Sequence, residues 1–122
     1  MILVDTSIWV DHFHKHVPEL AEALERELVL MHPFVIGELA CGNLKRRDEV
    51  LSLLAALPAP AIATDAETLL FIEERKLMAK GIGYIDAHLL ASVMLTSDGQ
   101  LWTRDKRLRS VATALRLTAP LP

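Results

Sequence analysis

The stretch Ile2-Leu3-Val4-Asp5-Thr6-Ser7, at the start of the chain, decides the fold. Its three apolar residues predict a short buried strand, and the three polar residues that follow are typical of the start of a helix. Asp5 is the only charged side chain among the first ten residues. Two roles stay open for it, a helix cap and a ligand, because Thr6 or Ser7 could also cap the helix.

The rest of the chain continues this alternation of short apolar runs and helical patterns. Strands are expected at residues 2–4, 28–31, 61–63, 100–103 and 117–118. Helices are expected up to His14 or His16, then over 18–27, from Pro33 to Gly42-Asn43, over 46–57, from Thr64 or Asp65 to about Lys80, over 83–96 and over 105–115. Strands that alternate with helices predict an α/β fold, with a parallel sheet covered on both faces.

Length and composition narrow the class of protein. The 122 residues suffice for one domain, taken as residues 1–122, and 52% of them are hydrophobic. The apolar runs are too short for a membrane span, and the first residues lack the pattern of a secretion signal. A single cysteine, Cys41, excludes an internal disulfide and a cysteine-rich zinc site. A cytoplasmic protein is expected.

The charge is unevenly distributed. A net charge of −3 argues weakly against a dedicated nucleic-acid binder. Two basic clusters nevertheless stand out, Lys45-Arg46-Arg47 and the group Arg104, Lys106, Arg107, Arg109 and Arg116. Either cluster is equally consistent with a solvated face of the protein and with a surface that binds an anionic partner.

Four acidic residues occupy unusual positions. Asp5 and Asp105 each follow a predicted strand, which places them at the carboxyl edge of the sheet, where ligands bind in such folds. Glu38 is the only charged residue from Leu28 to Leu44, and Asp86 is the only one from Gly81 to Ser97. A carboxylate on an apolar helix is costly unless it is paired or bound to a metal.

Each acid also has a simpler explanation. Glu38 could reach solvent at the edge of a short helix, and Asp86 lies in a first helical turn, where the helix dipole favours a carboxylate. Asp105 belongs to the charged run 104–107. If the four carboxylates converge, their repulsion calls for a cation, and an all-oxygen set suits Mg²⁺ or Mn²⁺. Such ions promote hydrolysis of phosphodiesters.

The chain resembles the PIN-domain ribonucleases, and more narrowly the VapC-type toxins of bacterial toxin–antitoxin pairs. The resemblance rests on four segments in series along the chain: Leu3-Val4-Asp5-Thr6-Ser7, His32-Pro33-Phe34 through Gly37-Glu38-Leu39, Gly83-Tyr84-Ile85-Asp86-Ala87-His88-Leu89, and Leu101-Trp102-Thr103-Arg104-Asp105-Lys106-Arg107-Leu108. It implies a three-layer α/β/α sandwich around a short parallel sheet.

The same resemblance implies a metal site and its chemistry. Asp5, Glu38, Asp86 and Asp105 would hold Mg²⁺, with Mn²⁺ as a substitute, and would be the catalytic residues of an endoribonuclease that uses a metal-activated water. Hydroxyls of Thr6 or Ser7 and of Thr103 would lie beside them. Many relatives carry a further acid where this chain has Arg107, so a second metal would depend on the substrate phosphate.

Partners follow from the resemblance as well. Arg104, Lys106 or Arg107 would steady the RNA backbone, and Lys45, Arg46 and Arg47 would extend that track. A cognate antitoxin would cover the acidic groove, and a homodimer would form through helices early in the chain. The alternatives are a PIN nuclease in RNA processing or DNA repair, a non-catalytic interaction module, and a receiver-like signalling domain.

Other conspicuous residues have structural interpretations. His32, before Pro33, is expected to cap or turn the chain, and His88 is expected to lie in the core or behind the site. Cys41 is expected to be a small buried residue. Trp9 and Trp102 are candidates for the core or an interface.

Overall fold

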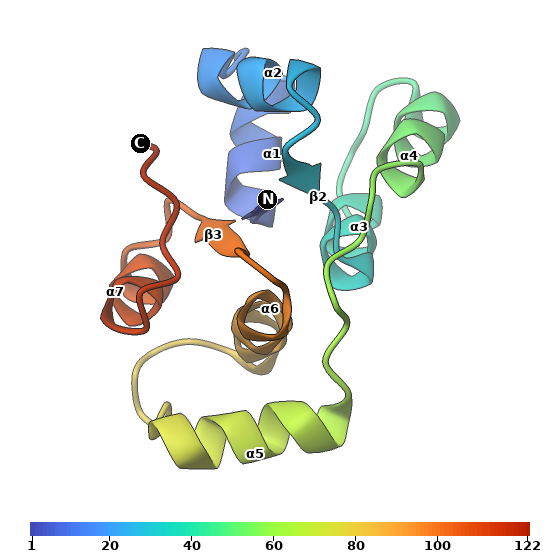
Figure 1. The fold of residues 1–122 in the computed structure, drawn as a ribbon. Coiled ribbons are helices and arrows are strands. Elements are labelled where there is room, and N and C mark those ends of the chain that lie inside the picture. The colour runs from blue at the N-terminus through green and yellow to red at the C-terminus, as the bar shows by residue number, and fades with distance from the viewer.

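The computed structural model describes residues 1–122 as seven helices and three strands (Figure 1). The strands are β1 (Ile2–Val4), β2 (Val29–Leu30) and β3 (Gln100–Trp102). The helices are α1 (Thr6–His14), α2 (Pro18–Glu25), α3 (Pro33–Ala40), α4 (Arg47–Ala55), α5 (Asp65–Arg75), α6 (Tyr84–Leu95) and α7 (Lys106–Ala114). The α/β class and the alternation read from the sequence are confirmed.

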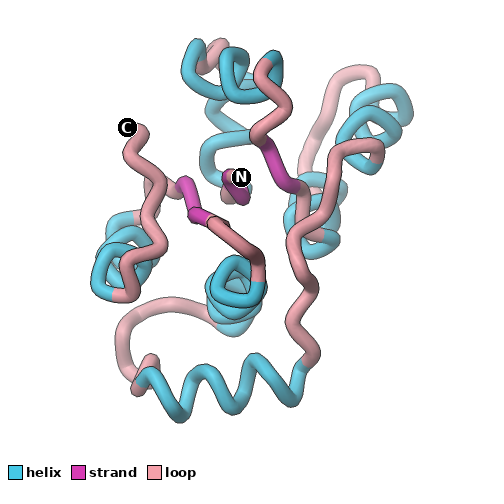
Figure 2. Tube along the Cα trace, in the orientation of Figure 1, coloured by secondary structure: helices cyan, strands magenta, loops and turns pink.

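The sheet is small and fully parallel, in the order β2-β1-β3 (Figure 2). Leu3 pairs with Leu30 on one side and with Leu101 on the other. Leu3 and Val4 have no exposed surface, which fits a strand covered on both faces. Because all three strands run the same way, the residues that follow β1 and β3 meet at one edge.

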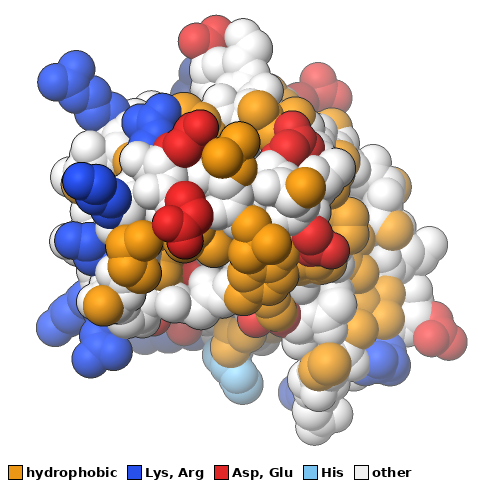
Figure 3. All heavy atoms as spheres, turned by 90° about the horizontal axis from the view of Figure 1, so that it is seen from below, with side chains coloured by type: hydrophobic (Ala, Val, Ile, Leu, Met, Phe, Trp, Pro, Cys, Tyr) orange, Lys and Arg blue, Asp and Glu red, His pale blue; other side chains and the backbone are white.

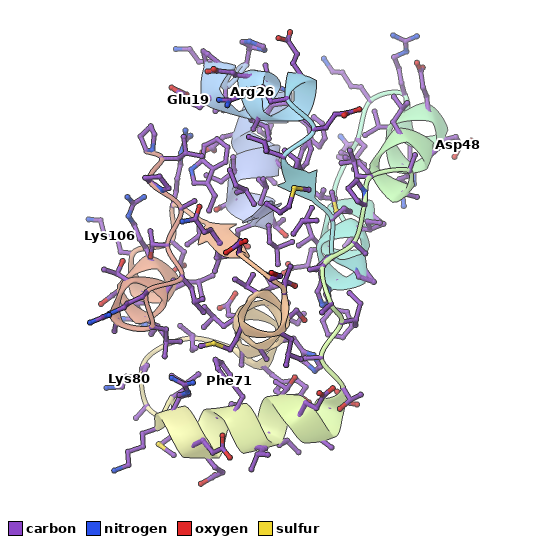
Figure 4. All side chains as sticks on the ribbon, viewed as in Figure 1. Glu19, Arg26, Asp48, Phe71, Lys80 and Lys106 are labelled. Carbon is purple, nitrogen blue, oxygen red and sulfur yellow. The ribbon has the colours of Figure 1, made fainter.

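Helices cover the sheet on both faces, in layers (Figure 1). On one face α6 lies between β3 and α5, and Phe71 of α5 points toward α6 (Figure 4). Helices α1 and α2 lie on the opposite face, α3 and α4 lie beside β2, and α7 lies beside β3. The three-layer sandwich thus forms, with α6 and α1 as the inner helices.

Two of the five predicted strands are wrong. Residues 61–63 form no strand, because the N–H groups of Ala61 and Ala63 donate to the side chains of Thr96 (2.9 Å) and Ser92 (3.1 Å) on α6. At the C-terminus, Thr118 makes only an isolated bridge to Leu101.

The helix predicted to reach Lys80 ends earlier, at Arg75. Lys76 adopts the left-handed conformation, with φ of 54°, which stops α5. The chain then turns again through Ala79 and Gly81, both with positive φ, before α6 begins at Tyr84. This loop, residues 76–83, leads from the end of α5 to the first turn of α6, which carries Asp86.

One cluster of 27 buried residues forms the core. Trp9 and Trp102 belong to it, which confirms their expected core positions. Cys41 is exposed, so the expectation that it is buried is wrong. It follows the last turn of α3 on the side away from Val35 and Leu39, which carry the packing of that helix. No helix is both long and apolar enough to cross a membrane.

Candidate functional site

Asp5 lies directly after β1 and is both helix cap and buried carboxylate. Its Oδ1 accepts a hydrogen bond from the backbone N–H of Thr6 (2.8 Å). Its Oδ2 accepts from the hydroxyls of Ser7 (3.0 Å) and Thr103 (2.7 Å). Only 7% of the residue is exposed. The two roles left open by the sequence are therefore compatible, because the cap uses only one carboxylate oxygen.

Thr103 connects Asp5 to Asp105 across the sheet edge. The buried Thr103 hydroxyl donates to Asp5 and accepts a hydrogen bond from the backbone N–H of Asp105 (3.1 Å). Asp105 in turn caps α7, where its Oδ1 accepts from the N–H of Leu108 (2.9 Å). The predicted strand-end position of both acids is thus found in the structure, with Thr103 between them.

Glu38 reaches the same edge from α3. Its Oε1 accepts a hydrogen bond from the Thr6 hydroxyl at 2.7 Å. The simpler interpretation, in which Glu38 reaches solvent at the edge of a short helix, agrees with the structure, because Phe34, Glu38 and Cys41 are all exposed. That face of α3 opens outward, so Glu38 is available to a ligand without the cost of burying its charge.

Asp86 completes the group from the first turn of α6. Its Oδ2 accepts a hydrogen bond from the backbone N–H of Gly83 (3.1 Å). Burial raises the pKa of Asp86, the Gly83 N–H opposes that rise, and the carboxylates of Asp5, Asp105 and Glu38 raise it further. The four acids are therefore close enough for their charges to affect Asp86. No three of them, however, lie close enough together to form a complete set of metal ligands.

The first basic cluster is largely engaged in local contacts. The Arg47 guanidinium donates to the carbonyls of Ala40 (2.6 Å) and Gly42 (3.4 Å), and so caps the end of α3. Arg46 pairs with Glu49 at 3.0 Å on the surface of α4. Lys45 is exposed and makes no ion pair.

The second cluster lies close to the acids. Arg104 pairs with Asp11 at 2.8 Å and also donates to the carbonyl of Pro122 (3.3 Å). Lys106 and Arg107, in the first turn of α7, are exposed and make no ion pair. These two cations are therefore the ones free to meet an anionic ligand beside Asp105.

Two buried histidines, His32 and His88, lie close to each other. His32 caps α3, as expected, with Nδ1 accepting from the N–H of Phe34 at 3.0 Å. Burial, and to a lesser extent nearby His88, lowers the pKa of His32 to about 4. His88 is buried, as expected, and its Nδ1 lies 3.2 Å from the hydroxyl of Thr68.

A contact between α5 and α6 was not found from the sequence. Asp65 Oδ1 accepts from the Tyr84 hydroxyl (2.9 Å) and lies 2.9 Å from Nε2 of His88. The Tyr84 hydrogen bond, and then His88, lower the pKa of Asp65. In the structure Thr64 and Glu67 cap the start of α5. The sequence indicated only that a helix starts at Thr64 or Asp65, and no signal in it showed that Asp65 contacts α6.

Comparison with known proteins identifies the family of this chain. The PIN domain family matches residues 2–114, and the chain belongs to that family. Within it, the chain is 46% identical over 110 residues to Ribonuclease VapC32 of Mycobacterium tuberculosis (strain CDC 1551 / Oshkosh), covering 90% of this chain and 89% of the relative. The protein of the same name from strain ATCC 25618 / H37Rv matches equally well.

Proposed function

We propose that this protein is a metal-dependent endoribonuclease and the toxin of a type II toxin–antitoxin pair. One observation carries the proposal: hydrogen bonds through Thr6 and Thr103 link Glu38, Asp5 and Asp105 at the carboxyl edge of the sheet. The charges of these three carboxylates also raise the pKa of Asp86, after the effect of its burial. The 46% identity to a protein named as a ribonuclease identifies RNA as the substrate class.

The donor set fits a hard divalent cation. Asp5, Glu38, Asp86 and Asp105 offer only oxygen atoms, which favours Mg²⁺, with Mn²⁺ as a substitute. Burial is the first cause of the raised pKa of Asp86, and the neighbouring carboxylates add to it; a bound cation would offset both effects. When bound, the cation supplies Lewis acidity at the phosphodiester and lowers the pKa of water.

The chain's own residues orient the carboxylates. Hydrogen bonds from Ser7 and Thr103 hold Oδ2 of Asp5, and the Thr6 hydroxyl aims Glu38. Residues that are already held in place lose less freedom when substrate binds, which lowers the barrier of the reaction. Lys106 and Arg107, with Lys45 and Arg46 further away, supply positive charge for the RNA backbone, and Arg104 contributes if it leaves Asp11.

The partners follow from the same surface. We propose that a cognate antitoxin inserts a basic side chain among the carboxylates, since it would neutralise the repulsion as a cation does. We also propose a homodimer, discussed below, and activity in the cytoplasm, where RNA and the antitoxin meet. The basic patch Lys45-Arg46-Arg47 keeps a smaller role in RNA binding, because α3 already holds Arg47.

The test is an incubation of antitoxin-free protein with a mixed RNA pool, in Mg²⁺, in Mn²⁺ and with EDTA. The control is Asp86→Asn protein prepared in the same way, which exposes contaminating nucleases. We expect cleavage that requires the metal and falls by at least about a hundredfold in the variant. Cleavage that persists with EDTA, or equally in Asp86→Asn, would refute the proposed site.

A further inference from the structure

A groove lies between the end of α5, the following loop and α7. It has a cavity of about 240 Å³. Its lining consists of Arg75, Lys76, Leu77, Lys80, Ser110, Val111, Ala114 and Leu115. Figure 4 places Lys80 and Lys106, the first residue of α7, on the same side of the molecule.

The groove is lined by two kinds of side chain. Arg75, Lys76 and Lys80 form its basic rim, and apolar residues such as Val111 and Ala114 form its floor. Arg75, Lys76 and Lys80 make no ion pair, and no acidic residue is among the lining. Figure 3, which views the molecule from the α5 side, shows Lys and Arg gathered along its left edge. In a chain whose net charge is −3, this concentration of unpaired cations indicates an anionic ligand.

One wall of the groove leads to Asp105. Helix α7 begins at that residue, and Arg107, Val111 and Ala114 follow one another along one face of the helix. Residues 106–114 rise by about 12 Å in all, at about 1.5 Å per residue. Val111 and Ala114 therefore lie within about 12 Å, along the helix axis, of the end of α7 that follows Asp105, although Asp105 itself is on another side of the helix.

The other wall leads to Asp86. The loop 76–83 carries Lys76 and Lys80, and its Gly81 packs against the side chain of Arg107. The loop ends at Gly83, whose backbone N–H donates a hydrogen bond to Asp86. A Cβ atom on Gly81 would lie 2.5 Å from Cδ of Arg107, so the two walls are in close contact there. Both walls thus run from the groove to a carboxylate of the same site.

We propose that this groove binds the nucleotides that flank the cleaved phosphodiester on one side. Phosphates would contact Lys76, Lys80 and Arg107, and a base or ribose would pack on the floor formed by Val111 and Ala114. The inference rests on the proposed ribonuclease function and extends its RNA site beyond the acids. Arg107 was among the cations expected from the sequence to bind RNA, whereas Lys76 and Lys80 were not.

The test measures RNA binding rather than cleavage. Protein carrying Asp86→Asn is titrated into a short fluorescein-labelled single-stranded RNA, and anisotropy gives Kd at several salt concentrations. The groove variant adds Lys76→Gln and Lys80→Gln. The matched control adds Lys15→Gln and Arg26→Gln, which remove the same charge from the region of α1 and α2; Figure 4 shows Arg26 far from Lys80.

We expect the groove variant to bind on the order of tenfold more weakly at about 0.1 M salt. The slope of log K against log salt should fall by about 1.4, because each lost phosphate contact contributes about 0.7 for a single strand. The control variant should show no comparable change in Kd or in the salt slope. Equal Kd and slope for the groove variant and the control would overturn the inference while leaving the ribonuclease proposal intact.

A second variant tests the floor instead of the charge. Ala114→Trp fills the groove, and we expect weaker binding with an unchanged salt slope. Should this variant fail to fold by circular dichroism, Ser110→Phe tests the same floor from the previous turn of α7. A parent protein that binds no RNA would overturn both the groove and the proposed function.

Discussion

At the scale of single residues, Asp5 shows how one side chain serves fold and site together. Its Oδ1 caps α1, and its Oδ2 accepts two hydroxyl hydrogen bonds. Three donors stabilise a carboxylate that is nine-tenths buried, since charged acceptors form the stronger hydrogen bonds. The sequence could therefore not separate a cap from a ligand, because the geometry allows both.

The ionised carboxylate of Asp86 is expected to lower the stability of the metal-free protein. Its pKa is raised in the folded state, so above that pKa the ionised carboxylate makes the folded state less stable. Asp86→Asn keeps an acceptor for the Gly83 N–H and removes the repelling charge. We expect the metal-free variant to be more stable at pH 7 by up to about 1 kcal/mol, because solvent screens part of the repulsion. Urea unfolding of the natural protein and of Asp86→Asn measures this difference in the free energy of unfolding.

Added metal should reverse that order. Mg²⁺ stabilises whichever protein binds it, so it should raise the Tm of the natural protein and leave Asp86→Asn nearly unchanged. Glu74→Gln, an exposed change on α5, is the control and should respond to Mg²⁺ as the natural protein does. A variant Asp86→Asn stabilised by Mg²⁺ as strongly as the natural protein would argue against Asp86 as a ligand.

His32 gives the protein a pH dependence of stability. Its folded pKa of about 4 lies below its ordinary value of 6.5, so between these values the unfolded state binds a proton that the folded state does not. Stability should therefore fall as pH falls through this window, by at most about 1.4 kcal/mol per pH unit. Below about pH 4 both states are protonated, and the contribution of His32 stops changing.

The variant His32→Asn isolates this effect. Asparagine retains an acceptor for the Phe34 N–H but does not titrate, so the unfolding free energy should vary less between pH 6.5 and 4. His14→Asn, on an exposed histidine, is the matched control and should keep the slope. The same slope in His32→Asn as in the natural protein would contradict this account.

At the scale of elements, the contact between α5 and α6 holds the helix that carries Asp86. Asp65, the first residue of α5, binds Tyr84 and His88, which flank Asp86 on α6. Thr68 of α5 also lies 3.2 Å from Nδ1 of His88, and the rest of the contact is made by apolar side chains such as Phe71. The Asp65 contacts therefore fix where the first turn of α6 lies relative to α5.

Loss of this contact should affect the metal requirement more than the fold. We expect Asp65→Ala to need several-fold more Mg²⁺ for half-maximal RNA cleavage, because Asp86 is less well placed. Asp65→Asn, which retains an acceptor for the Tyr84 hydroxyl, should recover part of the loss. Glu67→Ala, in the same first turn, is the control for general damage to the start of α5. A lower rate at every Mg²⁺ concentration, with no shift, would instead indicate a purely structural effect.

The elements also show what the sequence could predict. Strands β1 and β3 and the helices after them were found because apolar runs and capping residues are local signals. Residues 61–63 were misread, since their N–H groups bind Ser92 and Thr96, about 30 residues away, instead of a strand. The metal site of four acids stays a prediction from position and family resemblance, whereas the exposure of Glu38 depends on how α3 packs.

At the scale of the whole molecule, large apolar side chains remain exposed at several places, and two groups of them are candidates for an interface. One group lies on α5 and near its ends: Ile62, Leu69, Leu70, Tyr84 and Ile85. Figure 3 shows hydrophobic side chains spread over this face. The other, smaller group is Val10 and Phe13 on α1. An apolar surface of this kind is typical of a contact with another protein chain.

The larger group is where we expect the proposed homodimer to form. Leu69 and Leu70 are 56% and 58% exposed, against 41% for Phe13, so burying them gains more from the hydrophobic effect. This differs from the expectation that helices early in the chain form the dimer. A charge at both α5 positions should prevent association, because an unpaired buried carboxylate is costly.

Light scattering with size-exclusion chromatography tests this on the natural protein and two variants. We expect Leu69→Glu with Leu70→Glu to elute as a monomer, and Phe13→Glu to keep the mass of a dimer. Both variants should keep the natural far-ultraviolet circular dichroism, because all three side chains are already exposed in the single chain. If Phe13→Glu alone gives the monomer, α1 forms the interface, and the apolar surface of α5 is left for the antitoxin.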